Sequence, residues 1–345
     1  MRLTAQQLEG AAARILAAAG ASDSDARQVA TRLVNGNLVG HDSHGVIRLC
    51  QYADQLRDGS IKSGGELTLV ADFGAVSVFD ANLGFGQVMA EAATRKGIEK
   101  AKTYGSATIG LRNVAHVGRL GDWAELAAEE GLVSFHFVNS PAKPAVSPFG
   151  GVERRMSTNP ICVGIPVEGR APVIVDMTTS SVAEGKLRVA NAAGRSIPEG
   201  WILDKEGKPS RNPGDYYDGG AMLTMGAHKG YGLSLVVDLM AGALTGGGTT
   251  SPTESVNRNN MLSFFIDPAA CHAGQEANGI AAGYIDWVKA SAARDPAAPV
   301  LIPGEPENLE RAKRSENGIE VPEGIWRQIL DTAKGLGLSE SALLA

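Results

Sequence analysis

The spacing of apolar residues predicts helices at both ends of the chain. Thr4 and Gln7 form a capping box, helical spacing continues to Gly20, and a second helix is predicted from about Ser24. A terminal helix is predicted from about residue 322 to 334. We expect the first two helices and the segment that follows them to form a small helical bundle.

Between these ends, short apolar runs alternate with longer amphipathic segments. The runs predicted as strands are 67–70, 76–79, 107–111, 133–138, 161–166, 173–176 and 261–266. The predicted helices are 87–104, about 120–130, a short one after residue 180, one after residue 227 and about 278–294. The helix after residue 227 places Leu233, Val236, Val237, Met240 and Leu244 on one apolar face. Residues 139–160 and 300–307 are predicted as loops, and the class is mixed α/β.

The stretch of residues 40–58 carries the densest candidate chemistry. It is predicted to be one helix with Ser43 as its N-cap. At ~100° per residue, His44, Arg48 and Tyr52 would form an i, i+4, i+8 stripe on its polar face. Such a stripe places an imidazole, a guanidinium and a phenol side by side above the positive end of the helix.

A small carboxylate fits this predicted face. Arg48 offers a planar fork for a carboxylate, and His44 can exchange a proton near neutral pH. Ser43 and Tyr52 can orient a neighbouring oxygen atom. The alternative is a capped helix whose polar side faces water, and the residues alone favour neither interpretation.

Three further residues lie where predicted strands or turns lead into helices. His116 lies in a glycine-bracketed turn, Asp176 ends a strand ahead of a run of hydroxyls, and Lys229 stands at a helix entrance. These positions suit, in turn, an acid or base, a ribose or phosphate partner, and an anionic cofactor. The alternatives are a turn histidine bonded to backbone and ordinary N-capping hydroxyls.

Composition narrows the classes of function. The chain has 345 residues, 43 glycines and a net charge of −6, with no cluster of basic residues, which argues against a nucleic-acid binder. No run approaches the ~20 apolar residues that span a bilayer, and no signal-like segment opens the chain, so we expect a cytoplasmic protein without membrane partners. Cys50, Cys162 and Cys271 lack CxxC spacing and are expected to be reduced.

Two familiar motifs are only imitated. Gly84 and Gly86 follow a strand-like run, but Met89 stands at the third glycine position and no acidic residue has the expected spacing, which excludes a standard Rossmann site. His41 and His44 are two potential metal ligands on either side of a helix start, which is too few for a metal site, and we predict none.

Several motifs together resemble the malate/L-lactate dehydrogenase family of type 2. They are DSHGVIRL, NVAHVGRLG, STNP, VDMTTSSVAEGK, HKGYGLSLVVDLMAG and PGEPENLERAKRSENGI, and they occur in order over nearly the whole chain. The resemblance implies an oxidoreductase that transfers a hydride between NAD or NADP and a small 2-oxo or 2-hydroxy acid, as a homodimer with its active site in an interdomain cleft.

The resemblance also implies a fold and a domain division. It implies a non-Rossmann NAD(P)-binding domain with a largely antiparallel sheet, beside a helical domain built from both chain ends. The expected parts are a helical substrate-side domain at 1–65 and 307–345, a connecting domain at 66–120 and 267–306, and an NAD(P)-binding domain at 121–266.

Site residues follow from the matching motif positions. On the substrate side they are Ser43, Arg48 and Tyr52, and the catalytic candidates are His44, His116 and Asp176. On the cofactor side they are Asn139, Ser140, Asn159, Asp176, Met177, Thr178, Lys186, His228, Lys229, Gly304 and Glu305. Of the two histidines, His44 is preferred for proton transfer because it shares a predicted face with Arg48, with Asp176 expected to support its charged form.

Three alternatives stay open at this point. Within the family they are a cyclic imino-acid reductase and a ureidoglycolate dehydrogenase, and outside it a non-catalytic small-anion binding protein. The last needs Arg48 but neither His44 nor the Asp176 and Lys229 regions. The sequence leaves open the side chain of the hydroxy acid, the choice between NAD and NADP, and the direction of the reaction.

Overall fold

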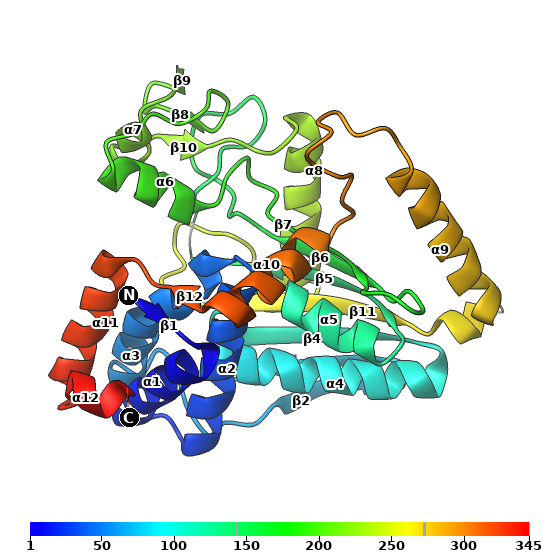
Figure 1. Cartoon of the computed structure of the whole chain (residues 1–345), viewed down its shortest axis with the longest axis horizontal. Coiled ribbons are helices and arrows are strands. Elements are labelled where there is room, and N and C mark those ends of the chain that lie inside the picture. Colours follow the sequence, from blue (N-terminus) through cyan, green and yellow to red (C-terminus); the bar gives the residue numbers. More distant parts are fainter. Residues whose placement is uncertain (143, 272–273, 345) are drawn as a thin grey trace.

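The computed structural model describes residues 1–142, 144–271 and 274–344, and its centre is a seven-stranded sheet (Figure 1). In spatial order the strands are β2 (Thr68–Phe73), β3 (Val76–Asp80), β4 (Ser106–Val114), β11 (Asn259–Ile266), β5 (Val133–Asn139), β6 (Ile161–Ile165) and β7 (Val173–Met177). All neighbouring pairs are antiparallel except β3 and β4. The seven predicted strands are therefore confirmed, and so is the largely antiparallel sheet.

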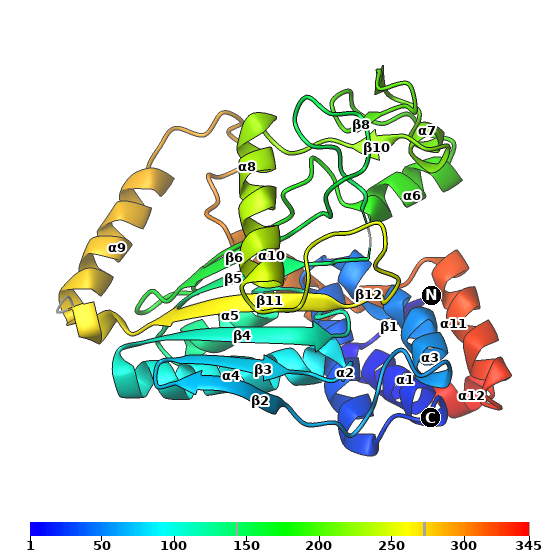
Figure 2. The same cartoon turned by 180° about the vertical axis from the view of Figure 1, so that it is seen from behind.

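Helices cover both faces of this sheet. Helices α4 (Gly86–Tyr104) and α5 (Gly121–Glu129) pack on one face around the fully buried Trp123 and Phe265. On the other face lies α8 (His228–Val237), which continues as the π-helix η3 (Asp238–Ala243) (Figure 2). The capping glycine Gly105 ends α4 with a φ of 82°, as its sequence position predicts.

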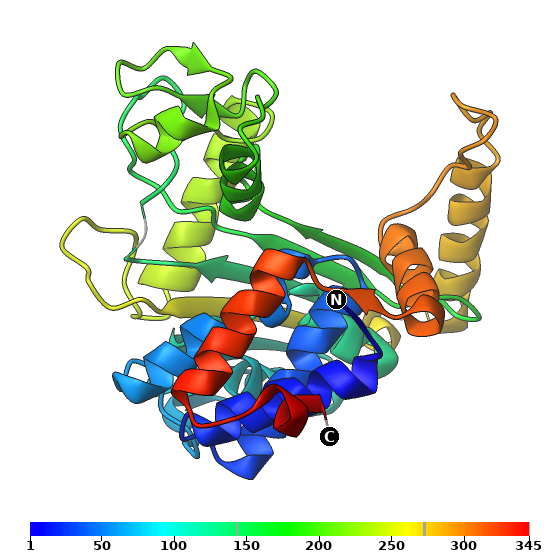
Figure 3. The ribbon, with the colours of Figure 1, turned by 60° about the vertical axis from the view of Figure 1, so that its left-hand side comes forward.

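A helical bundle brings the two chain ends together (Figure 3). It contains α1 (Ala5–Ala18), α2 (Asp23–Leu38), α3 (Leu49–Arg57), α11 (Glu323–Gly335) and α12 (Glu340–Leu344). Its core packs Leu8, Ile15 and Leu33 of the first helices with Ile329 of α11, all fully buried. Strand β1 (Arg2–Leu3) pairs with β12 (Ile319–Glu320), which joins the N-terminus directly to the C-terminal part of the chain.

A smaller unit stands above the sheet. Helices α6 (Glu184–Ala192) and α7 (Pro213–Tyr217) surround the short strands β8 (Ile202–Leu203), β9 (Pro209–Ser210) and β10 (Ala221–Met222). Ile202 and Met222 pack there with Val146, which belongs to the predicted loop 139–160. No helix within the described ranges is long and apolar enough to cross a membrane.

One segment predicted as a loop belongs partly to a helix. Residues 305–317 form helix α10 (Glu305–Asn317), although the sequence predicts a loop that includes residues 305–307. The helix buries no residue, so it lacks the apolar periodicity that reveals other helices. Ion pairs hold it instead, including Arg314 to Asp42 at 2.7 Å.

The apolar face predicted after residue 227 is mostly uncovered. Val237 is fully buried, but Leu233, Val236 and Leu244 are 39%, 48% and 63% exposed. Helix α9 (Gly274–Lys289), which begins four residues before its predicted start, also carries exposed Ile280, Tyr284 and Trp287. Exposed apolar patches of this kind mark interaction surfaces.

Candidate active site

The stretch predicted as one helix from Ser43 is broken. Residues 42–44 and 46–48 form two short 3-10 turns, and α3 begins only at Leu49, with Arg48 instead of Ser43 at its N-cap position. Between the turns Gly45 is extended, and Asn37 packs so closely that a Cβ on Gly45 would lie 2.3 Å from its Oδ1. The same Oδ1 accepts the N–H of Val46 at 2.9 Å, which replaces a helical hydrogen bond. The predicted i, i+4, i+8 stripe is therefore wrong.

The break brings different groups together. The rings of His44 and His116 stack with centroids 5.5 Å apart and planes 15° from parallel. Ser43 Oγ lies 3.1 Å from His44 Nδ1, and Arg48 Nε donates to the Ser43 carbonyl at 2.8 Å. The two candidate histidines thus share one site with the candidate carboxylate-binding arginine.

Tyr52 points into the protein instead of lying on a polar surface. It is 1% exposed, and its hydroxyl lies 2.6 Å from His116 Nδ1. Gln87 of α4 donates to the same hydroxyl at 2.9 Å. The sequence did not single out Gln87, whose only signal is its place inside the imitation glycine motif, between Gly86 and Met89.

His44 is held in its neutral form. Burial lowers the pKa of His44 to about 3, with further lowering by the nearby charges of Arg48, His41 and Arg119. Asp176, which was expected to support the charged form, accepts the N–H of Gly121 at 2.7 Å instead. At neutral pH the His44 ring therefore acts as a hydrogen-bonding group and a weak acid at most.

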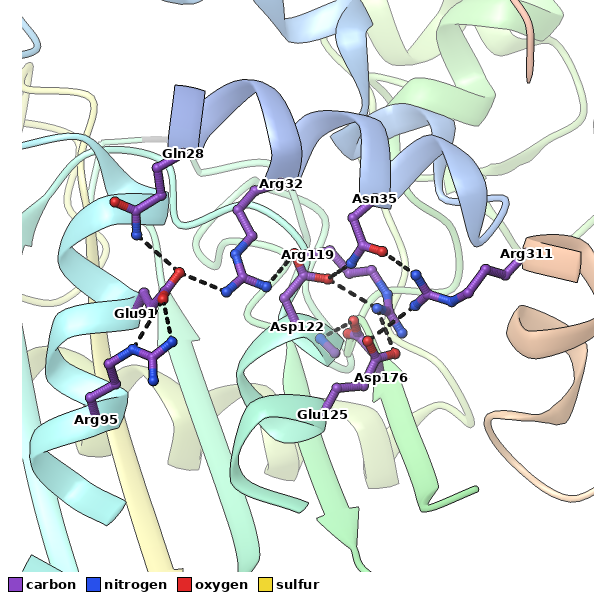
Figure 4. A network of polar contacts seen from close by, with 11 residues as sticks. Gln28, Arg32, Asn35, Glu91, Arg95, Arg119, Asp122, Glu125, Asp176 and Arg311 are labelled. Carbon is purple, nitrogen blue, oxygen red and sulfur yellow. Dashed lines mark hydrogen bonds and ion pairs between the residues drawn. The ribbon is translucent and has the colours of Figure 1, made fainter. Parts of the chain in front are cut away.

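A buried ionic network lies behind Asp176 (Figure 4). Arg119, whose side chain is 1% exposed, pairs with Asp122 at 3.0 Å and with Glu125 at 2.8 Å. Burial raises the pKa of Asp176, although the positive charge of Arg119 opposes that rise. Arg311 of α10 contacts Glu125 at 3.2 Å, so the network reaches from the sheet to the C-terminal segment.

The pKa values of an arginine and of a carboxyl are both raised in this network. The pKa of Arg119 is raised, which indicates favourable pairing, yet burial raises the pKa of Asp122 to about 6. One guanidinium faces three carboxylates, so it gains from all of them while Asp122 is also repelled by Glu125. The same set of charges therefore raises the pKa of Arg119 and leaves the pKa of Asp122 raised by burial.

The predicted cofactor residues gather along one edge of the sheet. Because β5 and β7 run the same way, against β6 and β11, their C-terminal ends meet the starts of β6 and β11 at this edge. The residues brought there are Asn139, Ser140, Asn159, Asp176, Met177 and Thr178. The end of β4, which leads to His116, lies at the same edge because Val114 pairs with Asn259.

Asn259 joins the histidine turn to the cofactor-side residues. Its Oδ1 accepts the N–H of Val117 at 3.1 Å, and its Nδ2 donates to Ser140 Oγ at 2.6 Å. The sequence analysis missed this residue. Its only signal is a pair of adjacent asparagines at the start of a strand.

The start of α8 lies against the end of β7. Met225 N donates to the Thr179 carbonyl at 3.0 Å, which places the exposed His228 and Lys229 beside the hydroxyl run. Lys186 is also exposed and lies on α6, next to Gly185, whose added Cβ would be 3.5 Å from Ser43 Cβ. Helix α6 therefore lies over the Ser43 side of the site.

Gly304 and Glu305 are not brought to this edge. A Cβ added to Gly304 would lie 3.1 Å from Pro172 O and 3.2 Å from Ile174 N. This glycine therefore packs against the beginning of β7 rather than its end. Glu305 pairs with Lys289 of α9. Within one chain these two residues lie away from Met177 and Thr178.

One buried atom at the edge lacks a partner within the described ranges. Asn159 is fully buried and donates through Nδ2 to the Ser234 carbonyl at 3.0 Å, but its Oδ1 accepts no hydrogen bond there. A buried acceptor of this kind fits an N–H group of a bound molecule. No group of three or more potential metal ligands occurs among the residues described.

Comparison with known proteins identifies the family of this chain. A family model described as malate/L-lactate dehydrogenase matches residues 3–330. Hydroxycarboxylate dehydrogenase B from Escherichia coli O157:H7 is 37% identical, over 100% of this chain and 97% of its own length. Malate dehydrogenase from Pyrococcus abyssi is 33% identical, over 98% of this chain and 96% of its own. The solved structure of a putative malate/lactate dehydrogenase from E. coli has a TM-score of 0.95 and 36% identity, and covers 99% of this chain and 97% of that one.

Proposed function

Because the chain belongs to the malate/L-lactate dehydrogenase family, we propose that it transfers a hydride between NAD or NADP and a small 2-oxo or 2-hydroxy acid. The observation that carries the proposal is the position of two stacked histidines and Arg48 beside the polar edge of the sheet. A non-catalytic anion binder would need only the arginine. The clustering of proton-exchanging and cofactor-side groups supports an enzyme.

Arg48 holds the carboxylate of the substrate. Its Nε is bonded to the Ser43 carbonyl and its Nη1 to Gln51 Oε1 at 3.0 Å, so the guanidinium plane is fixed before any substrate binds. A fixed planar fork orients a carboxylate through two parallel hydrogen bonds. The carbonyl carbon next to that carboxylate then lies near His44 and His116.

His116 is the group that exchanges the proton. Hydride addition to a 2-oxo acid leaves charge on the carbonyl oxygen, which needs a proton from a group within hydrogen-bond reach. His44 is a poor source because its pKa is lowered to about 3 by burial and by neighbouring cations. His44 instead donates or accepts a hydrogen bond that orients the oxygen. This assignment reverses the preference drawn from helical spacing.

The sheet edge holds the nicotinamide dinucleotide, which supplies or accepts the hydride when bound. The buried Oδ1 of Asn159 fits a carboxamide N–H. Thr178 lies at the same edge, where its hydroxyl donates to the Thr158 carbonyl at 2.8 Å. Lys186, His228 and Lys229, all exposed, provide positive charge or hydrogen bonds for phosphates. This arrangement would bind the cofactor without a Rossmann fold.

The molecule is proposed to be a cytoplasmic homodimer divided as the family resemblance implies. The helical part at 1–65 and 307–345 carries the substrate side, residues 121–266 bind the cofactor, and 66–120 with 267–306 connect them. The exposed apolar residues of α8 and α9 support association of two copies. Such a dimer offers a way for Gly304 and Glu305 to approach a cofactor site from the other subunit.

The function is tested by following nicotinamide absorbance with NADH and NADPH against a panel of 2-oxo acids and cyclic imines. We expect turnover with at least one 2-oxo acid. His116→Ala should lower kcat by about 10²–10⁴-fold and flatten its pH dependence, whereas His44→Ala should mainly raise KM. Loss of the pH dependence in His44→Ala alone would return the proton-transfer role to His44.

A further inference from the structure

A buried hydrogen-bond chain runs from α4 through α3 to His116. Gln87 Nε2 donates to the Tyr52 hydroxyl at 2.9 Å, and that hydroxyl lies 2.6 Å from His116 Nδ1. We propose that Gln87 is a positioning residue that acts through Tyr52 to decide which ring nitrogen of His116 carries the proton. The inference rests on the proposed function, in which His116 exchanges a proton with the substrate.

The observed arrangement fits one tautomer of His116. An amide N–H can only donate, so the Tyr52 hydroxyl accepts from Gln87 and gives its own hydrogen to His116 Nδ1. Burial raises the pKa of Tyr52 to about 12, so this hydroxyl stays protonated at neutral pH. Neutral His116 then carries its proton on Nε2, a form that donates from Nε2 but takes up no proton there.

The other tautomer needs an acceptor for the Tyr52 hydrogen, and Gln87 has one. Its Oε1 is buried and has no hydrogen-bond partner within the described ranges. A half-turn of the amide exchanges Oε1 with Nε2, two atoms of nearly equal size. The hydroxyl of Tyr52 then donates to Oε1 and accepts from the Nδ1–H of His116.

Only this second arrangement suits proton transfer at Nε2. In oxidation, Nε2 would take the hydroxyl proton of the 2-hydroxy acid, the oxidised nicotinamide cofactor of the proposed function would accept the hydride from the carbon, and His116 would become an imidazolium. In reduction, the imidazolium returns the proton from Nε2 to the new alkoxide. Nδ1–H stays bonded to Tyr52 throughout, so the proton that moves is the one on Nε2.

The surroundings leave space for the amide to turn. Gly118 has a φ of +78°, and a Cβ there would lie 3.3 Å from both Cγ and Nε2 of Gln87. His44 from η1 stacks on His116, and Tyr52 from α3 lies within hydrogen-bond distance of it. Helix α4 contributes the uncharged Gln87, so the amide can reorient without moving a charge.

Variants at position 87 test the proposal through the pH profile. Gln87→Glu offers only acceptors and a negative charge, so it fixes the second arrangement and should raise the midpoint of the kcat–pH profile by about one pH unit. Gln87→Met removes both hydrogen-bonding atoms and should lower kcat on the order of tenfold in both directions. Thr94→Val, on the same helix and 1% exposed in the native chain, is the matched control and should keep the native profile.

A second readout needs neither cofactor nor turnover. The ring ¹⁵N shifts of the six histidines report their tautomers, and the signals of His116 are those lost in His116→Ala. We expect Gln87→Glu to move His116 to the Nδ1–H form, and Thr94→Val to leave it unchanged. Identical His116 tautomers and pH midpoints in native protein, Gln87→Glu and Gln87→Met would overturn the proposal.

The proposed role of His116 and the proposed role of Gln87 predict different results for these variants. If His116→Ala keeps native kcat and pH dependence, the proposed function is wrong at that residue. If His116→Ala loses both while the Gln87 variants behave like Thr94→Val, only the relay is wrong. Should Gln87→Glu not fold, Gln87→Met in the His116→Ala background decides. It should cost nothing further, and an additive loss would contradict the relay.

Discussion

Arg48 is the residue whose chemistry depends most on geometry rather than charge. Its guanidinium is already oriented by the Ser43 carbonyl and by Gln51, at 2.8 Å and 3.0 Å. A lysine would keep the positive charge but lose the planar fork and the bond to Ser43. The change from arginine to lysine at position 48 therefore distinguishes the effect of charge from the effect of two-point orientation.

We expect Arg48→Lys to raise KM for a 2-oxo acid by one to two orders of magnitude, roughly 1.5–3 kcal/mol, with little change in cofactor affinity. Steady-state kinetics with fluorescence titration of the reduced cofactor measure both quantities. Loss of cofactor binding with a normal KM would place this arginine on the cofactor side instead.

Residue types and predicted positions led to the prediction of Ser43, His44, Arg48 and His116, because few other side chains combine proton exchange with carboxylate binding. The direction of Tyr52 could not be predicted in the same way. It depends on the extended backbone at Gly45, which exists because Asn37 occupies the adjacent space. The contact between Asn37 and Gly45, eight residues apart, cannot be predicted from the helical spacing of residues 43–58.

At the scale of elements, α5 joins the site to the helical bundle through buried charge. Asn35 of α2 donates to Asp122 at 2.8 Å, and Arg32 of α2 lies 4.0 Å from the same carboxylate. Asp122 is 2% exposed, and burial raises its pKa from 3.8 to about 6. The charged form of Asp122 thus costs stability that the surrounding donors only partly offset.

This shift predicts a pH dependence of stability. A carboxyl whose pKa is raised in the folded state binds its proton more tightly when folded. Its contribution is therefore fully present below pH 4 and is lost as the pH rises through about 6. We expect the difference in unfolding free energy between native protein and Asp122→Asn to change by about 2–3 kcal/mol across this range.

Denaturant unfolding at several pH values measures this difference. Glu323→Gln, at a side chain 83% exposed on α11, is the control and should give a difference that does not vary with pH. A pH-independent gap between the native chain and Asp122→Asn would show that Asp122 is ionised throughout. In that case its pairing with Arg119 would outweigh its burial.

At the scale of the molecule, short apolar runs were enough to locate all seven strands of the sheet. Six of these strands contain buried residues, whereas β2 is exposed or half-exposed along its whole length. The order of the strands and the position of α10 were not predictable from the same pattern. Strand β11 inserts between β4 and β5 from far along the chain, and α10 is held by ion pairs such as Arg314 to Asp42. Strand pairing between distant segments and ion pairs produce no regular spacing of apolar residues in the local sequence, so this pattern cannot reveal them.

A single copy of the chain leaves a large apolar surface exposed on α8, η3 and α9. Helix α9 stands away from the sheet (Figure 3) and presents Ile280, Tyr284 and Trp287 at 73%, 65% and 73% exposure. On α8 and η3, Leu235 and Leu239 are 44% and 51% exposed. Side chains of this size and number are rarely left in water, which favours a second copy of the chain as their cover.

We expect Trp287→Glu to convert a dimer into a monomer of 35.8 kDa, because a charge would be buried without a partner at the contact. Light scattering after size exclusion measures the mass. Phe73→Glu, at another aromatic side chain, 81% exposed on β2, is the control and should leave the dimer intact. If Phe73→Glu gives the monomer and Trp287→Glu does not, the copies meet along the β2 edge, and α9 has another role. Loss of turnover together with dissociation would further indicate that the site needs residues from both subunits.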